Sequence, residues 1–125
     1  MKNEFLAKAT ENISAAELLF DNELYNASAN RAYYAAFHAA IAALAAIGVE
    51  TEAISHPAAQ SQFNAELIHR RKIYPSRLKS YLSHLQEERN TADYKRDSVS
   101  KKVASRQLKK AKDFVETIVQ EIEKW

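Results

Sequence analysis

The chain of 125 residues has no cysteine, one glycine and two prolines. Without cysteine it can form no disulfide, thiol nucleophile or cysteine metal site, which suits a reducing compartment such as the cytoplasm. Scarce glycine and proline disfavour the tight turns that join strands and favour long helices with short connections. A single glycine also cannot build a P-loop, a dinucleotide fingerprint or a nucleophile elbow. These absences exclude several enzyme classes and indicate an all-α protein without a cofactor.

The longest uncharged stretch, residues 32–49, has 18 residues, which is a borderline length for a membrane span. Half of it is alanine and it contains His38, so we expect a buried helix of a soluble protein and no membrane association. Charges interrupt the apolar residues at the start of the chain, so we expect no signal peptide.

Charge is distributed unevenly along the chain. Residues 1–69 hold 3 basic and 8 acidic side chains, a balance of −5, whereas residues 70–125 hold 15 basic and 8 acidic side chains, a balance of +7. A basic half is typical of proteins that bind RNA or nucleotides. The alternative is a set of solvated helix faces of mixed charge.

Apolar periodicity predicts five helical segments. Spacings of three and four residues indicate a first helix over residues 3–20, and Asn26 or Ser28 is the expected cap of a second helix, which Gly48 ends. A third helix is expected from Ser55-His56-Pro57 to residues 70–72, and a fourth from residues 75–76 to 93–94. The fifth starts after Ser98 or Ser100. Its apolar residues recur at alternating spacings of four and three, which predicts the seam of an antiparallel bundle: Ala104, Leu108, Ala111, Val115, Ile118, Ile122 and Trp125.

The predicted fold is an up-and-down antiparallel bundle of four to five helices in one domain, residues 1–125. The second helix is apolar on nearly all sides, so it is expected at the centre. Its alanines, at positions 32, 35, 36, 39, 40, 42, 43, 45 and 46, allow neighbouring helices to approach closely.

Three polar side chains lie in apolar surroundings and are candidates for chemistry. Arg31 and His38 are two turns apart on the second helix, about 10 Å along one face, with Tyr34 between them. Arg89 continues the apolar register of Leu78, Leu82 and Leu85, where a guanidinium group needs a partner or a cleft. Structural alternatives exist for each: Arg89 can pair with Asp93, Arg31 can pair with Glu23 or Asp93, and His38 can be a hydrogen-bonded core residue.

A metal site is not expected. A di-iron bundle requires two Glu-x-x-His motifs and two further carboxylates, and only the segment from Glu66 to His69 has this form.

Two strings resemble the HEPN family, named for nucleotide binding in higher eukaryotes and prokaryotes. They are RAYYAAFHA, from Arg31 to Ala39, and RNTADY, from Arg89 to Tyr94. The resemblance extends to the order of segments, to a histidine at the start of the third helix, here His56, and to the closing amphipathic helix.

The resemblance implies a helical bundle that dimerises and a partner that is a minimal nucleotidyltransferase, often in a toxin–antitoxin or defence pair. Active members are metal-independent ribonucleases, in which a histidine transfers protons and an arginine stabilises the phosphorane. Their catalytic motif usually lies near the late helix and has a form like Arg-Asn-x-x-x-His-x-Tyr. This chain matches it at Arg89 and Asn90. Its histidine position is filled by Tyr94 and its final tyrosine position by Arg96.

Because no histidine follows Arg89, we expect a module that binds RNA or a nucleotide without efficient catalysis. Its expected binding residues are Arg31, Tyr34, His38, Arg89, Asn90, Asp93 and Tyr94. The first alternative is an active endoribonuclease, with Arg31, Arg89, His38 and Asp93 as its catalytic candidates. The second alternative is a structural bundle, in which these side chains form a buried hydrogen-bond network.

Overall fold

The computed structural model describes residues 2–95 and 98–124, which form helices and no strand. The helices are α1 (Lys2–Asp21), α2 (Tyr25–Ala46), α3 (His56–Gln62), the π-helical segment η1 (Phe63–Arg70), α4 (Arg77–Tyr94) and α5 (Lys101–Glu123). The prediction of an all-α bundle is therefore confirmed. Trp125 and Arg96 lie outside the described residues.

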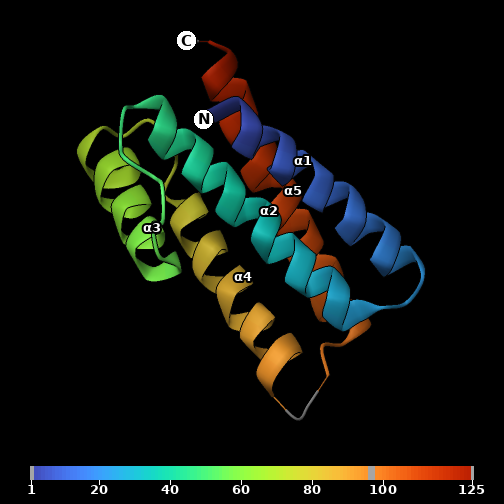
Figure 1. The fold of residues 1–125 in the computed structure, drawn as a ribbon. Helices are drawn as coiled ribbons and strands as arrows, with labels where there is room; N and C mark the ends of the chain where they lie inside the picture. The colour runs from blue at the N-terminus through green and yellow to red at the C-terminus, as the bar shows by residue number, and fades with distance from the viewer. Residues whose placement is uncertain (1, 96–97, 125) are drawn as a thin grey trace.

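Helix α2 is the central element of the bundle, as predicted. In Figure 1 it is flanked by α1, α4 and α5, while α3 and η1 also pack against α2, beside α4, and the two chain ends lie at the same end of the molecule. Because alanine side chains are small, three neighbouring helices can contact α2 at once. Those at the centre of the helix are buried, namely Ala32, Ala35, Ala36, Ala39, Ala40, Ala42 and Ala43.

Gly48 ends α2 as predicted. Its φ of +85° is a left-handed conformation, in which the Val49 amide donates to the Leu44 carbonyl and the Gly48 amide to the Ala45 carbonyl. This pair of bonds is a Schellman motif, which satisfies carbonyl groups that the last helical turn leaves free.

The prediction that Asn26 or Ser28 caps α2 is wrong, because the helix already begins at Tyr25 and has no side-chain cap. Both side chains bond to other parts of the chain. The buried Ser28 hydroxyl donates to the Ala16 carbonyl at 2.8 Å, which ties α2 to α1. The Asn26 side chain accepts from the Val99 amide at 2.8 Å and so holds the segment before α5.

The predicted third helix is present over residues 56–70, but its second half is π-helical. Ser55 caps its start by accepting from the Ala58 amide at 3.2 Å, and Pro57 lies in its first turn. At its end the Arg71 amide donates to Glu66, five residues back, as π-helical bonding requires. Phe63 and Leu67 are fully buried and attach this segment to the core.

Helices α4 and α5 pack as their predicted apolar seams require. Leu78, Leu82 and Leu85 of α4 are buried. Ser100 caps α5 by accepting from the Val103 amide at 3.2 Å. The buried residues of α5 include most of its predicted seam, namely Ala104, Ala111, Val115, Ile118 and Ile122.

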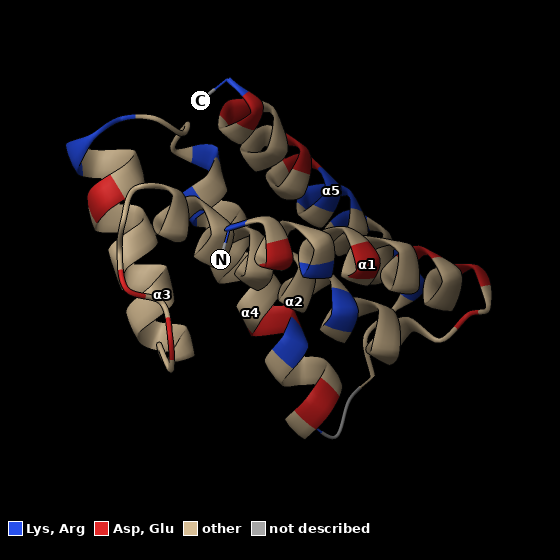
Figure 2. Cartoon of the chain, turned by 45° about the horizontal axis from the view of Figure 1, so that its top comes forward, with Lys and Arg blue, Asp and Glu red and all other residues tan. Residues whose placement is uncertain are grey.

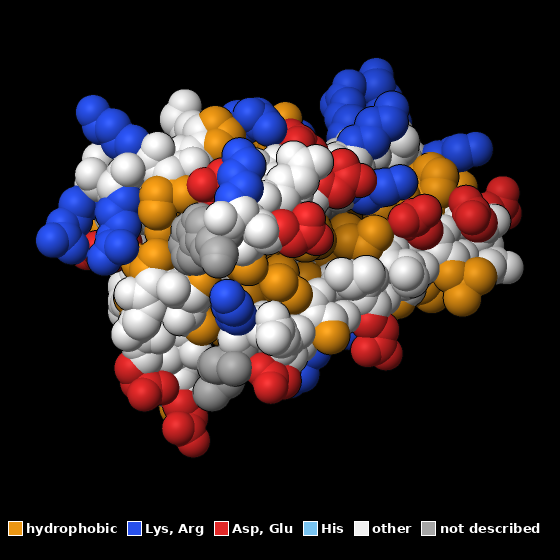
Figure 3. Space-filling model, turned by 90° about the horizontal axis from the view of Figure 1, so that it is seen from above, with side chains coloured by type: hydrophobic (Ala, Val, Ile, Leu, Met, Phe, Trp, Pro, Cys, Tyr) orange, Lys and Arg blue, Asp and Glu red, His pale blue; other side chains and the backbone are white. Residues whose placement is uncertain are grey.

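On the faces that Figures 2 and 3 show, the described basic residues stand in separate groups. Figure 2 shows Lys and Arg residues on α5 and at the corner between η1 and α4, with acidic residues among them. Figure 3, a view onto the end that holds both termini, shows separate basic groups with acidic side chains between them. Several cations are paired, such as Arg77 with Asp113 at 2.9 Å and Lys112 with Glu17 at 3.7 Å. Within residues 2–95 and 98–124, no helix is both long and apolar enough to cross a bilayer.

Candidate functional site

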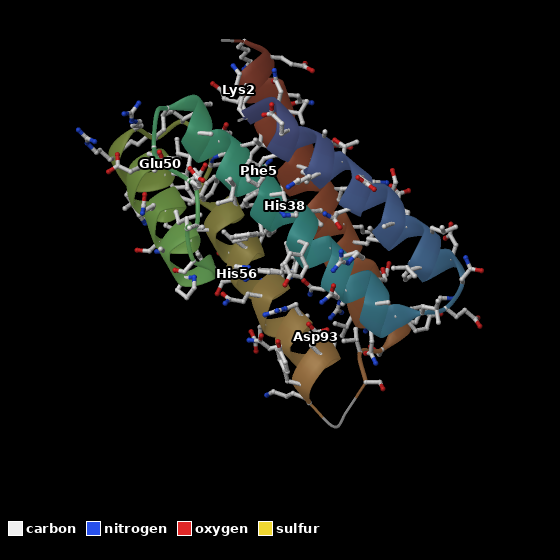
Figure 4. The ribbon with its side chains drawn as sticks, viewed as in Figure 1. Lys2, Phe5, His38, Glu50, His56 and Asp93 are labelled. Atoms are coloured by element: carbon white, nitrogen blue, oxygen red, sulfur yellow. The ribbon has the colours of Figure 1, made fainter. Side chains whose placement is uncertain are left out.

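The polar residues singled out on α2 meet side chains from α1, α3 and α4 on one face of the bundle. Figure 4 shows His38, His56 and Asp93 on the face turned toward the viewer, with α5 behind. Helix α2 thus buries its alanines on one side and presents its polar residues on this side. We call this surface the α2 face; its members are Asn12, Asn30, Arg31, Tyr33, Tyr34, His38, His56, Arg89 and Asp93.

Arg89 reaches from α4 to α2 and is only 16% exposed. Its Nη2 donates to the Tyr34 hydroxyl at 3.1 Å, and its Nε lies 3.2 Å from Asp93 Oδ2 in an ion pair that lacks hydrogen-bond alignment. Its Cζ also lies 5.4 to 5.6 Å from the ring centres of Tyr33, Tyr34 and Tyr94. Burial opposes the charge, but the neighbouring oxygens outweigh it, so the pKa of Arg89 is raised. The pairing of Arg89 with Asp93 is confirmed.

Asn30 connects Asp93 to Arg31. Its Nδ2 donates to Asp93 Oδ2 at 2.8 Å, and its Oδ1 accepts from Arg31 Nε at 3.0 Å and from Nη2 at 2.6 Å. The structural alternative in which Arg31 pairs directly with Glu23 or Asp93 is therefore wrong, because the adjacent Asn30 amide takes the place of the carboxylate. Two guanidinium groups, those of Arg31 and Arg89, are thus linked through one carboxylate.

Asn12 of α1 joins Arg31 to His38. Its Oδ1 accepts from Arg31 Nη1 at 3.3 Å, and its Nδ2 lies 3.2 Å from His38 Nδ1. Arg31 also stacks on Tyr34, with its Cζ 5.0 Å from the ring centre. The expectation that Arg31 and His38 share a face is confirmed, since one amide contacts both. Burial first, and then the charges of Lys8, Arg31 and His56, lower the pKa of His38.

His56, at the start of α3, is a member of the α2 face that sequence reasoning did not assign to the site. Its Nδ1 lies 3.1 Å from the Tyr33 hydroxyl, and its ring centre is 4.2 Å from Phe37 and 5.7 Å from Tyr34. Burial and the charge of Arg89 lower its pKa, so a neutral imidazole is favoured next to Arg89. Burial raises the pKa of Tyr33 to about 12, so its hydroxyl keeps its proton.

The remaining candidates, Asn90 and Tyr94, are neighbours of Arg89 on α4. Asn90 is half-buried, next to Arg89 on α4. Tyr94 is 74% exposed and forms the outer border of the Arg89 surroundings. The structure therefore brings Arg31, Tyr34, His38, Arg89 and Asp93 together, while their roles stay predictions.

The Glu-x-x-His segment has other contacts. Glu66 pairs with Arg70 at 2.8 Å, and His69 Nε2 lies 3.3 Å from Lys79 Nζ. In the described part of the chain, no three acidic or histidine side chains are arranged to hold a metal ion.

The α2 face offers mainly hydrogen-bond donors and π-faces. Arg31 and Arg89 are always charged, and their single shared carboxylate leaves a surplus of positive charge. Guanidinium groups bind phosphate and stack on aromatic rings, and tyrosines stack with bases. The arrangement therefore suits a ligand that carries phosphate.

Comparison with known proteins supports the resemblance seen in the two strings. The profile of the HEPN domain matches residues 3–122, so the chain belongs to the HEPN family. A protein of Methanocaldococcus jannaschii named "Putative toxin MJ0605" is 58% identical over 36 residues, which cover 29% of this chain and 27% of that protein. The match therefore spans about a quarter of the relative's length.

Proposed function

We propose that this member of the HEPN family binds RNA or a nucleotide on the α2 face and acts in a toxin–antitoxin type of system in the cytoplasm. The family membership and the name of the M. jannaschii relative support the type of system. The family resemblance also supports a homodimer and a minimal nucleotidyltransferase as partner. Efficient catalysis is not part of the proposal, because Tyr94 fills the position of the late histidine.

The observation that carries the proposal is the pair of guanidinium groups on the α2 face. The side chains of Arg31 and Arg89 are partly buried, come from two helices and are oriented by Asn12, Asn30 and Tyr34. Orienting a charge before the ligand arrives lowers the entropy cost of binding. An arginine that is fully solvated at the surface is hydrated by water and is not held in one orientation by protein side chains.

Replacing Arg89 by alanine is expected to weaken RNA or nucleotide binding about tenfold or more, because one charge-assisted contact to phosphate is lost. Arg77→Ala is the matched control, since Arg77 begins the same helix, is 48% exposed and pairs with Asp113 of α5. Fluorescence anisotropy with a labelled RNA and with a labelled nucleotide measures both variants. Equal binding by wild type and Arg89→Ala would remove Arg89 from the site.

A second candidate function, a metal-independent endoribonuclease, is favoured by the position of His56. This imidazole is oriented by the Tyr33 hydroxyl and shares the rings of Tyr33 and Tyr34 as neighbours with Arg89. Burial and the charge of Arg89 lower its pKa, which favours the neutral form. With Nδ1–H donated to the Tyr33 hydroxyl oxygen, Nε2 is free to accept the proton of a ribose 2′-hydroxyl while an arginine stabilises the phosphorane. His38 is less suited, because its Nδ1 faces the amide nitrogen of Asn12.

The ribonuclease candidate is tested with structured RNA in EDTA, at high concentration of the purified protein freed of its partner. Cleavage that is lost in both His56→Ala and Arg89→Ala, and kept in His84→Ala, would establish it; His84 lies on α4 and contacts Lys110 instead. Intact RNA after prolonged incubation would exclude it and leave the binding function standing.

A further inference from the structure

The orientation of the Asn12 side-chain amide is fixed by two partners that have only one hydrogen-bonding role each. Arg31 can only donate, so the atom 3.3 Å from its Nη1 must be the amide oxygen. The Lys8 carbonyl can only accept, so the atom 3.0 Å from it must be the amide nitrogen. A flipped amide would place donor against donor and acceptor against acceptor.

This orientation determines the tautomer of His38. The same Asn12 nitrogen lies 3.2 Å from His38 Nδ1, so Nδ1 must be the acceptor and carry no proton. In a neutral imidazole the proton is then on Nε2. Protonating Nδ1 would bring two donors together, which opposes the charged form.

The charges around His38 have the same effect. Burial disfavours an imidazolium at this position most, and the charges of Lys8 of α1, Arg31 of α2 and His56 of α3 add to it. Lys8 and His38 both neighbour the Phe5 ring: Lys8 Nζ lies 5.1 Å from its centre, and the His38 ring lies 5.8 Å from it. Figure 4 shows Phe5 and His38 next to each other where α1 meets α2.

We propose that Lys8, Arg31 and His38 form a phosphate-binding site, in which Asn12 is a positioning residue that makes His38 a hydrogen-bond donor through Nε2–H. The site deepens the proposed function and rests on it, since phosphate is common to RNA and nucleotides. All three side chains carry hydrogen-bond donors of the kind that phosphate oxygens accept from. In this arrangement His38 binds the ligand and has no lone pair available to accept a proton from it.

The tautomer is tested by long-range ¹H–¹⁵N correlation spectra of the full chain with labelled histidine. The expected pattern for His38 is an unprotonated Nδ1 and a protonated Nε2 at neutral pH. Asn12→Asp replaces the donor by an acceptor of the same shape, so the proton should move to Nδ1 and the pKa of His38 should rise. A wild-type spectrum with the proton on Nδ1 would overturn the proposal.

The donor role is tested by two neutral substitutions of His38. Glutamine can place an amide N–H near the position of Nε2–H, whereas alanine cannot. His38→Gln should therefore bind within about threefold of wild type, and His38→Ala should bind about tenfold more weakly, the loss expected for one hydrogen bond to a charged group. Equal losses in both variants would contradict a donor role.

Inorganic phosphate, AMP and a short single-stranded RNA serve as three separate probes in these titrations. Shifts of the His38 and Arg31 side-chain signals with all three support a site for phosphate itself, and shifts with RNA alone assign the site to a polynucleotide backbone. RNA binding that leaves His38 and Arg31 unchanged would overturn this inference while the proposed function stands. Absence of binding by every probe would overturn both.

Discussion

Replacing Arg89 by alanine should lower the free energy of unfolding by about 2 kcal/mol without unfolding the bundle. The substitution removes one ion pair, one hydrogen bond and the stacking of a guanidinium group among three tyrosines. It leaves the buried leucines of α4 in place.

The magnitude follows from these contacts. An ion pair at i, i+4, such as that with Asp93, contributes about 0.3 to 0.5 kcal/mol. A hydrogen bond from a charged donor to the Tyr34 hydroxyl contributes about 1.5 kcal/mol at a partly buried position. Cation–π contacts add about 0.5 to 1 kcal/mol, and relief of the desolvation of Arg89 subtracts part of this sum. A loss of about 2 kcal/mol is about 6 to 12 °C in Tm for a chain of this size.

Urea unfolding followed by far-ultraviolet circular dichroism measures the loss. Arg77→Ala is again the control, because its pairing with Asp113 is 48% exposed on the arginine side and should contribute only about 0.5 to 1 kcal/mol. Arg89→Lys keeps the charge but loses the planar stacking, so its free energy of unfolding should lie between those of Arg89→Ala and wild type.

Two results would refute the reasoning. A loss above about 4 kcal/mol would exceed what these contacts supply and would identify Arg89 as part of a buried structural network, the alternative in which the α2 face has no ligand. A loss no larger than that of Arg77→Ala would mean that the contacts to Tyr34 and Asp93 do not form in solution.

Three further predictions concern other parts of the fold. Ser28→Ala should cost about 1 kcal/mol in urea unfolding, because the buried hydroxyl that donates to Ala16 is lost; a neutral result would mean that this bond does not stabilise the α1–α2 contact. Gly48→Ala should lower the free energy of unfolding by about 1 kcal/mol in the same assay. A Cβ would meet no neighbouring atom there, so the loss comes from the φ of +85°, which disfavours any side chain. An unchanged urea midpoint would contradict the Schellman geometry. The free energy of unfolding should be greatest above pH 7 and fall as the pH drops through 6.5. The reason is that the pKa values of His38 and His56 in the folded chain lie below that ordinary value, so the unfolded chain binds more protons. In a His38→Gln, His56→Gln double variant the free energy of unfolding should decline less from pH 7 to 5.

Helix positions could be predicted because they depend on local signals. The first helix was expected over residues 3–20 and spans 2–21, and the fifth was expected after Ser98 or Ser100 and is capped by Ser100. The start of α2 was predicted wrongly because Asn26 and Ser28 are good caps by type, and only tertiary contacts show that they bond to Val99 and Ala16 instead. The π-helical bonding of η1 has no comparable sequence signal.

The site could be predicted only in part, because its orienting residues come from other helices. The meeting of α2 with Arg89 and Asp93 was expected, whereas Asn12 was not considered. A signal for Asn12 exists: it lies between the buried Ala9 and Ala16 at spacings of three and four, so it shares their side of α1. A polar residue on such a line is a candidate for a buried hydrogen bond with the neighbouring helix.

The chemistry of the α2 face depends on these orienting residues more than on the spacing of Arg31 and His38. An arginine and a histidine seven residues apart are compatible with a catalytic pair, but the Asn12 amide between them makes the histidine a donor. Because the same hydrogen bonds join α1, α2 and α4, truncation of any member changes stability as well as binding. Substitutions that keep the shape and change one donor or acceptor, such as Asn12→Asp and His38→Gln, therefore separate the two effects better than alanine does.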